Sequence, residues 1–330
     1  PCAETAVSPR LTRSAILQVL AAQAAEDPAT RWSSMSTPTR QAKSVPSRRQ
    51  GWLAWSFLLL LLLGLTACSG TRLLYQNLDW LTFEAMDDRF EIRPDQEDWV
   101  KASLDNLHTW HRVTQLPAYR LTLDELAVRF DDGLDAEDLA WLDRQVERHR
   151  RTLVDLVVPE LARFLADLDE EQLAHYAEAS QEAIDEAAEQ LEWSPRKRQT
   201  YRLETFVDRI EPWTGELSAA QHDGLARDVA GLADIRREWI GQRRARLREM
   251  TELLSRNPDQ AEIEAFLRAR WSDLDAAYSP GYVVQRRRLK QQVFEMLVRL
   301  DARLTPAQRR HVKERLEGYV STIDIVVASR

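Results

Sequence analysis

Apolar residues recur at alternate steps of three and four along much of the chain, the spacing of a buried face on an α-helix. Three such stripes are Leu139, Leu142, Val146, His149, Leu153 and Leu156; Leu173, Ala177, Ser180, Ile184, Ala187 and Leu191; and Val312, Leu316, Tyr319, Ile323 and Val327. No segment alternates convincingly with the period of two of a β-strand. The 10 glycines among 330 residues also disfavour turn-rich sheets. We therefore expect an all-α fold, an antiparallel bundle of about ten helices with no sheet.

Six segments carry the residues that begin helices. In Leu304-Thr305-Pro306-Ala307-Gln308, a threonine cap precedes a proline at the first helical position and a glutamine at the third, which together form a capping box. The same order recurs, in full or in part, at residues 92–96, 134–138, 168–172, 193–197 and 217–221. The intervals follow no fixed period, which argues against a solenoid repeat. Residues 218 to about 256 hold no proline and favour one long helix, although Gly224, Gly231 and Gly241 weaken it.

The N-terminal part has the features of an export signal. Four basic residues between positions 40 and 49 precede an uncharged, mostly apolar run over 52–67, and Met35 lies before both. This order predicts that residues 35–67 are a signal peptide. Residues 1–34 are then either an over-extended gene prediction or a disordered extension. We expect residues 68–330 to form a single helical domain, with room for two lobes.

The end of the apolar run, Leu65-Thr66-Ala67-Cys68, resembles a bacterial lipobox. The resemblance implies cleavage before Cys68, lipidation of its thiol and acylation of the new N-terminus. Ser69 in place of an aspartate points to the outer membrane rather than to retention at the inner one. The alternative is an uncleaved anchor over residues 52–71, because about 20 uncharged residues span a bilayer. The expected location is the periplasmic face of the outer membrane, with the lipid on Cys68 as the link.

The charge of the chain restricts its partners. Residues 68–330 hold 38 basic and 50 acidic residues, a net charge of −12, which argues against a nucleic-acid binder. The candidates for an anionic surface ligand are Arg236, Arg237, Arg243, Arg244, Arg286, Arg287 and Arg288. Lipid headgroups or glycan phosphates would suit such a basic surface. Alternatively, these arginines pair with the acidic stretch over residues 167–192.

The sequence offers little chemistry. It contains no phosphate-binding glycine loop, no nucleophile elbow and no zinc helix, so no catalytic residue and no cofactor is predicted. Asp105, His108 and His111 share one helical face and are the only metal candidates, with a further ligand needed from a residue such as His149 or His175. The alternative is that the two histidines stack on tryptophans at the edge of the core. The eight tryptophans after residue 68 fit helix crossings or a carbohydrate-stacking groove.

Residues 71–81, 110–112, 116–119 and 304–308 together resemble a family of proteobacterial outer-membrane lipoproteins catalogued only as a domain of unknown function. The resemblance implies a helical fold and a lipidated cysteine, and it brings no activity. The chain departs from it in the stretch before Met35 and at Arg93, which stands where a capping hydroxyl is expected. The Leu-Thr-x-x-Gln box at 304–308 is also similar to those of small periplasmic stress chaperones.

Three functions stay open at this point. The first is a non-enzymatic interaction or envelope-maintenance role, with a periplasmic protein or an envelope glycan as partner. The second is a chaperone-like sensor of misfolded envelope proteins, which an exposed apolar concavity would favour. The third is a metal-assisted enzyme on cell-wall or lipid substrates, which a closed pocket holding both histidines beside carboxylates would favour. The sequence indicates no oligomeric state.

Overall fold

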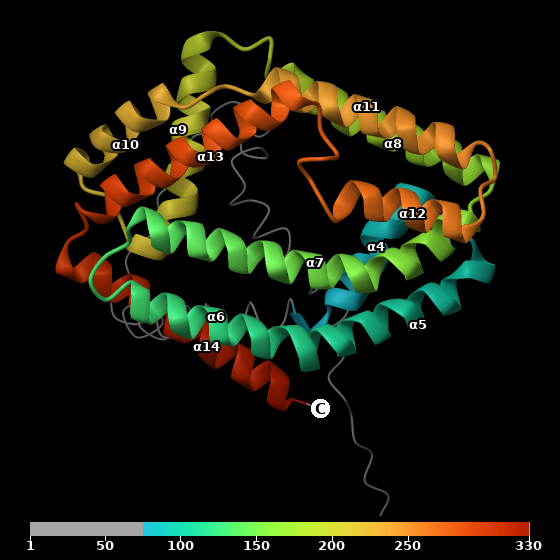
Figure 1. The fold of residues 1–330 in the computed structure, drawn as a ribbon, viewed down its shortest axis with the longest axis horizontal. Helices are drawn as coiled ribbons and strands as arrows, with labels where there is room; N and C mark the ends of the chain where they lie inside the picture. The colour runs from blue at the N-terminus through green and yellow to red at the C-terminus, as the bar shows by residue number, and fades with distance from the viewer. Residues whose placement is uncertain (1–74, 330) are drawn as a thin grey trace, which may run out of the picture. The chain divides into compact units, whose positions relative to one another are not determined.

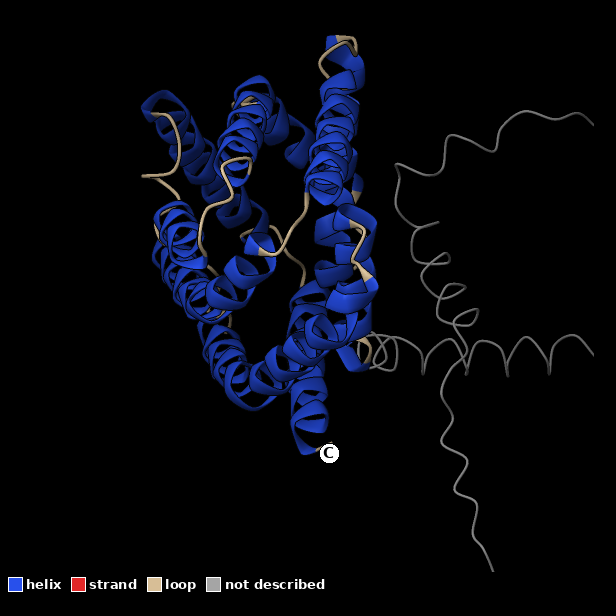
Figure 2. Cartoon of the chain, turned by 90° about the vertical axis from the view of Figure 1, so that its right-hand side faces the viewer, coloured by secondary structure: helices blue, strands red, loops and turns tan. Residues whose placement is uncertain are grey.

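The computed structural model describes residues 75–329. This part of the chain consists of helices joined by loops and contains no strand (Figure 1, Figure 2). The elements are α4 (Leu78–Phe90), α5 (Pro94–Trp110), the π-helical turn η1 (His111–Gln115), α6 (Leu116–Arg129), α7 (Ala136–Ala166), α8 (Glu170–Glu189), α9 (Pro195–Thr214), α10 (Ala219–Gly231), α11 (Arg236–Leu254), α12 (Gln260–Trp271), α13 (Pro280–Asp301) and α14 (Pro306–Ala328). Because α5, η1 and α6 are continuous, the described residues form ten helical runs. The expected all-α fold of about ten helices is confirmed.

All six segments that predict helix starts do begin helices, namely α5, α7, α8, α9, α10 and α14. In five of them the N-cap side chain accepts a hydrogen bond from the backbone N–H of the first turn; the caps are Asp135, Asp169, Ser194, Ser218 and Thr305. At α5 the N-cap is Arg93, whose backbone N–H donates to Gln96 Oε1 at 3.1 Å. Local capping therefore sets where these helices begin.

The expectation of one helix over residues 218–256 is wrong, because the chain breaks between α10 and α11. Distant side chains hold the break. The Arg202 guanidinium donates to the carbonyls of Leu232 and Ala233 at 3.2 and 3.4 Å. Gln292 accepts from the Ala233 N–H at 3.0 Å and donates to the Gly231 carbonyl at 3.1 Å. These partners satisfy backbone groups that a continuous helix would have paired.

Two pairs of capping-box glutamines join helix N-termini. Gln96 of α5 and Gln172 of α8 donate to each other's side-chain oxygens at 3.3 and 2.8 Å. Gln221 of α10 and Gln308 of α14 do the same at 2.7 and 3.1 Å. Each of the four amides also donates to the backbone carbonyl that lies two residues before its partner's N-cap. Gln96 donates to Asp167 and Gln172 to Glu91, and Gln221 donates to Arg303 and Gln308 to Glu216. All four glutamines are buried, and their polar groups are satisfied as burial requires.

The two glutamine pairs mark an arrangement that occurs twice. Helix α4 packs on α5 and α8, as α9 packs on α10 and α14; α5 packs on α7, as α10 packs on α13. The crossed contacts α6 with α14 and α11 with α8 follow the same correspondence, whereas the packing of α6 on α7 has no equal between α11 and α13. Leu161, Arg163, Ala166 and Leu168 precede Gln172 at the spacing at which Leu297, Arg299, Ala302 and Leu304 precede Gln308. The described chain thus forms two similarly arranged arms, α4–α8 and α9–α14, and α12, which packs on α7, has no counterpart in the first arm.

The core consists of three clusters. The largest joins α4, α5, α7, α8, α11 and α12, and includes the fully buried Val158, Ile263 and Leu267. The second joins α9, α10 and α13 around Val229 and Met296, and the third joins α6 and α14. None of the described helices combines the length and apolar character needed to cross a bilayer.

The predicted apolar stripes differ in how far their residues are buried in this core. Ile184 in the α8 stripe is 2 % exposed, which confirms that this stripe is buried. In α7, however, Val146 is 58 % exposed, and the buried line of the C-terminal half is Val154, Val158 and Ala162. A stripe chosen on apolarity alone drifts off the core because α7 is 31 residues long and meets different helices along its length.

Candidate functional site

Cys68 and the predicted signal peptide lie outside the described residues, which begin at Tyr75. The Tyr75 hydroxyl lies 2.9 Å from His111 Nδ1, and its ring centroid lies 4.8 Å from that of His108. The first described residue after the predicted lipidation site therefore contacts both histidines that the sequence singled out.

These contacts belong to a cluster of histidines and tyrosines at the π-helical turn. His111 begins η1, and π-helical turns are frequent at functional sites. The Tyr119 ring lies 5.4 Å from His111 and 4.7 Å from His149, both edge-on. His149 Nε2 in turn lies 2.9 Å from Thr122 Oγ1. The fold thus brings His149 near the other two histidines, with tyrosines between them.

The surroundings of the cluster favour uncharged rings. Burial raises the pKa of Tyr75 to about 12, and the nearby Arg112 opposes this shift. Burial lowers the pKa of His111, and His108 lowers it further. Burial also lowers the pKa of His149.

Asp105 is exposed, and His108 Nε2 is buried without a hydrogen-bond partner. Between residues 75 and 329 no group of three or more His, Cys, Asp or Glu side chains is placed to hold a metal. His175 lies elsewhere, where it pairs with Glu91 of the α4–α5 connection at 3.4 Å. The histidines of the cluster are therefore arranged with tyrosines, not with carboxylates.

Several of the basic candidates are ion-paired. Arg244 of α11 lies 3.0 Å from Asp185 on the acidic helix α8, and Arg286 and Arg287 both pair with Asp275. Arg237, Arg243 and Arg288 have no ion pair within residues 75–329, and Arg243 instead lies over the Trp239 ring, 4.9 Å from its centroid. Arg236 lines a cavity that is described below.

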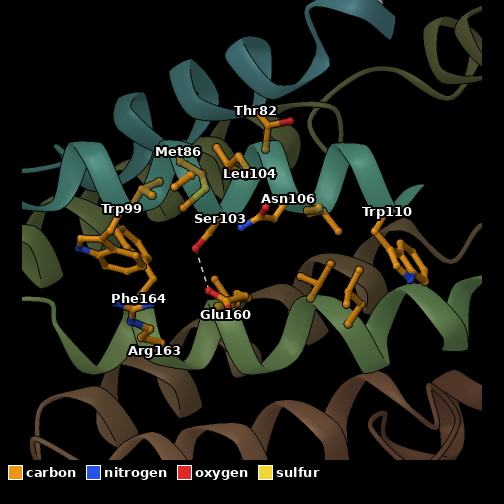
Figure 3. Close-up of a pocket in the computed structure, with 16 residues that line it drawn as sticks. Thr82, Met86, Trp99, Ser103, Leu104, Asn106, Trp110, Glu160, Arg163 and Phe164 are labelled. Carbon is orange, nitrogen blue, oxygen red and sulfur yellow. Dashed lines mark hydrogen bonds between the residues drawn. The ribbon is translucent and has the colours of Figure 1, made fainter. Parts of the chain in front are cut away.

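An apolar groove of about 460 Å³ lies between α5 and α7, with α4 along one side (Figure 3). Trp99 and Trp110 lie toward its two ends. The apolar lining includes Met86, Leu104, Leu107, Leu156, Leu161 and Phe164. The Ser103 hydroxyl donates to the Glu160 carboxylate across the groove at 2.8 Å (Figure 3). Its volume falls in the range of about 300–1,000 Å³ that is usual for ligand pockets.

The groove lining also includes five polar residues. They are Thr82, Ser103, Asn106, Glu160 and Arg163, and the Arg163 guanidinium stacks on Trp99 at 4.4 Å from the ring centroid. The lining contains no histidine. Sequence reasoning missed this site because one wall comes from α7, which is distant from α5 along the chain and contributes mostly ordinary apolar residues such as Leu156, Val157 and Leu161. The closest signal was the tryptophan pair on one face of α5.

The fold and the groove define an all-helical protein with an open apolar groove between α5 and α7. The chain belongs to a family of unknown function (DUF6279), whose model matches residues 88–282. The match runs from the end of α4 to the first residues of α13 and therefore includes both walls of the groove. No curated protein and no solved structure matches the chain.

Proposed function

We propose that this protein is a lipid-anchored, non-enzymatic component of the periplasmic face of the outer membrane, and that it binds apolar segments of envelope polypeptides. The groove between α5 and α7 carries the proposal. An exposed apolar concavity is the feature that distinguishes a chaperone-like role from a plain scaffold. The enzyme alternative needs both histidines in a closed pocket beside carboxylates, and the groove lining holds neither histidine.

The chemistry of the groove suits a polypeptide. Methionine, leucine and tryptophan side chains line it, and flexible apolar surfaces of this kind adapt to varied partners. Ser103, Asn106 and Glu160 in the lining offer hydrogen-bond donors and acceptors, which match a backbone amide and carbonyl. The spacing of Trp99 and Trp110 along α5 gives a length of about 16 Å at 1.5 Å per residue. That length accommodates roughly five residues of an extended chain.

A lipid on Cys68 would keep this groove close to the membrane. Only six residues separate Cys68 from Tyr75, so the tether reaches at most about 25 Å. The test is metabolic labelling with a fatty-acid analogue. We expect label on the native chain and none on Cys68→Ser; label on the serine variant would contradict the anchor.

Binding by the groove can be tested separately. Leu107 lies in the groove lining, whereas Leu121 on α6 is 65 % exposed and lies outside it. We expect a fluorescent peptide rich in leucine and phenylalanine to bind the native protein, and Leu107→Glu to weaken binding at least tenfold. Leu121→Glu is the matched control and should bind as the native protein does. Equal affinity of all three proteins, or no binding to the native one, would exclude the groove as the peptide site.

A further inference from the structure

A second cavity, of about 350 Å³, lies among α9, the α10–α11 connection, the start of α11, and α13. Two of its helices, α9 and α13, are the counterparts of α4 and α7 beside the apolar groove, whereas no residue of α10, the counterpart of α5, lines it. The two cavities therefore share only part of the helical frame around them. Their side chains differ in kind, because three arginines line the second one.

The positive charge of this cavity is not balanced locally. Arg202 and Arg209 come from α9, Arg236 is the first residue of α11, and Asp234 is the one acidic residue in the lining. Asp234 accepts from the backbone N–H of Arg236 at 3.2 Å. None of the three arginines has an ion pair in the described part of the chain. This differs from Arg244, which is paired, and it occurs in a chain of net charge −8.

Arg202 shows the electrostatic consequence. It is half-buried, and among the described residues its guanidinium donates only to the backbone carbonyls of Leu232 and Ala233. Burial lowers the pKa of Arg202 and Arg236 lowers it further, against an opposing effect of Asp234. A partly desolvated cation without a charged partner is unfavourable. An anion bound in the cavity would relieve this repulsion.

The remaining lining is mostly apolar and aromatic and includes Tyr201, Phe206, Trp239, Leu289 and Val293. Arginine forks match the oxygens of a phosphate in a bidentate manner. We propose that this cavity binds a phosphate monoester whose other part is a ring or a hydrocarbon. The arginines hold the phosphate, and the aromatic and aliphatic wall holds the remainder.

A monoester fits the charge of the site better than a singly charged anion does. Three arginines against one aspartate leave an excess of two positive charges, and a phosphate monoester carries about −1.5 to −2 at neutral pH. The first turn of α11 lies at the same cavity and adds its favourable dipole. A membrane lipid phosphate and a soluble sugar phosphate share this chemistry, so the experiment includes both.

Phenyl phosphate is a suitable probe because it combines a phosphate with a ring. By calorimetry on the whole protein we expect it to bind at least tenfold more tightly than inorganic phosphate. Arg209→Gln and Arg236→Gln should each weaken binding about tenfold or more. Arg209 is exposed on α9, so its variant should fold even where that of Arg236 does not. The matched control is Arg287→Gln, which removes an arginine that Asp275 already pairs and should leave the affinity unchanged.

Competition identifies the source of the ligand. If short-chain phosphatidic acid displaces phenyl phosphate at a lower concentration than glucose 1-phosphate does, the site exists and its ligand is a lipid phosphate. If glucose 1-phosphate is the stronger competitor, the site exists and its ligand is a sugar phosphate. The proposal is overturned if phenyl phosphate does not bind, or if neither competitor displaces it. It is equally overturned if Arg287→Gln weakens binding as much as Arg209→Gln.

Discussion

Gln221 donates to the side-chain oxygen of Gln308 at 2.7 Å, and Gln308 donates back at 3.1 Å. Each side-chain oxygen also accepts the N-cap N–H of its own helix. One amide therefore caps its helix and fastens it to a second helix far along the chain. Glutamate would serve the cap alone, because a carboxylate has no proton to donate and two carboxylates in contact repel. This double use explains the glutamine in both boxes.

Removing one partner of this pair should destabilise the fold. In Gln221→Leu the amide of Gln308 loses its buried partner, and an unsatisfied buried polar group costs about 1–3 kcal/mol. We expect a loss of that size in urea unfolding. Gln291→Leu, at an exposed position on α13, should change the stability by less than about 0.5 kcal/mol. If Gln221→Leu proves as harmless as this control, the pair is not formed.

The α8 stripe gives a second test. Ile184 is 2 % exposed, whereas Ile325 on α14 is 47 % exposed. Ile184→Asp places an unpaired charge in the core and should lower the free energy of unfolding by roughly 3 kcal/mol or more. Ile325→Asp should lower it by well under half of that. An unchanged melting temperature of Ile184→Asp would show that the stripe is not buried.

The histidine cluster predicts a pH dependence of stability. Because burial lowers the pKa of His111 and of His149 in the folded protein, the unfolded chain takes up these protons first as the pH falls. The contribution of these two histidines to the free energy of unfolding is complete above the ordinary histidine pKa of about 6.5. It is lost as the pH falls through that value towards their lowered pKa values in the folded protein. The double variant His111→Gln, His149→Gln should therefore lose less stability than the native protein between about pH 7 and about pH 5.

A control for this window is available. His222→Gln, at an exposed position on α10, should leave the pH dependence unchanged. Glu147 does not interfere, because its hydrogen bond from Arg150 lowers its pKa to about 2, so its contribution disappears only at lower pH. Identical slopes for the native protein and the double variant would contradict the assignment.

The metal alternative for Asp105, His108 and His111 has a direct test. We expect elemental analysis of the gently purified protein to find no stoichiometric zinc, iron or manganese, because the histidines contact tyrosines. About one such metal per chain, lost in His108→Ala with His111→Ala, would bring the enzyme hypothesis to the front. His175→Ala is the control and should leave the metal content as it is.

The parts of this fold that follow from neighbouring residues could be predicted from the sequence. Helix starts at Ser218 and Thr305 were predictable because a cap and its box lie within four residues. The break between α10 and α11 was not predictable, because Arg202 and Gln292, which bind its backbone groups, are far away in sequence. The same applies to both cavities, whose walls come from helices that are distant along the chain. Asp105, His108 and His111 share a helix face, but Tyr75 and Tyr119 surround the histidines, and only the fold reveals them.

The repeated arrangement makes each arm a natural reference for the other. The apolar groove lies beside α4 and α7, the arginine-lined cavity lies beside their counterparts α9 and α13, and the two linings differ in charge. One scaffold would then hold two chemically different ligands, an apolar polypeptide segment in the first arm and a phosphate monoester in the second. Exchanging the lining residues between the two arms would test whether the surrounding helices or the lining side chains determine which ligand is bound. Each arm has a buried glutamine pair between helix N-termini outside these linings, so an exchange of lining residues leaves both pairs in place.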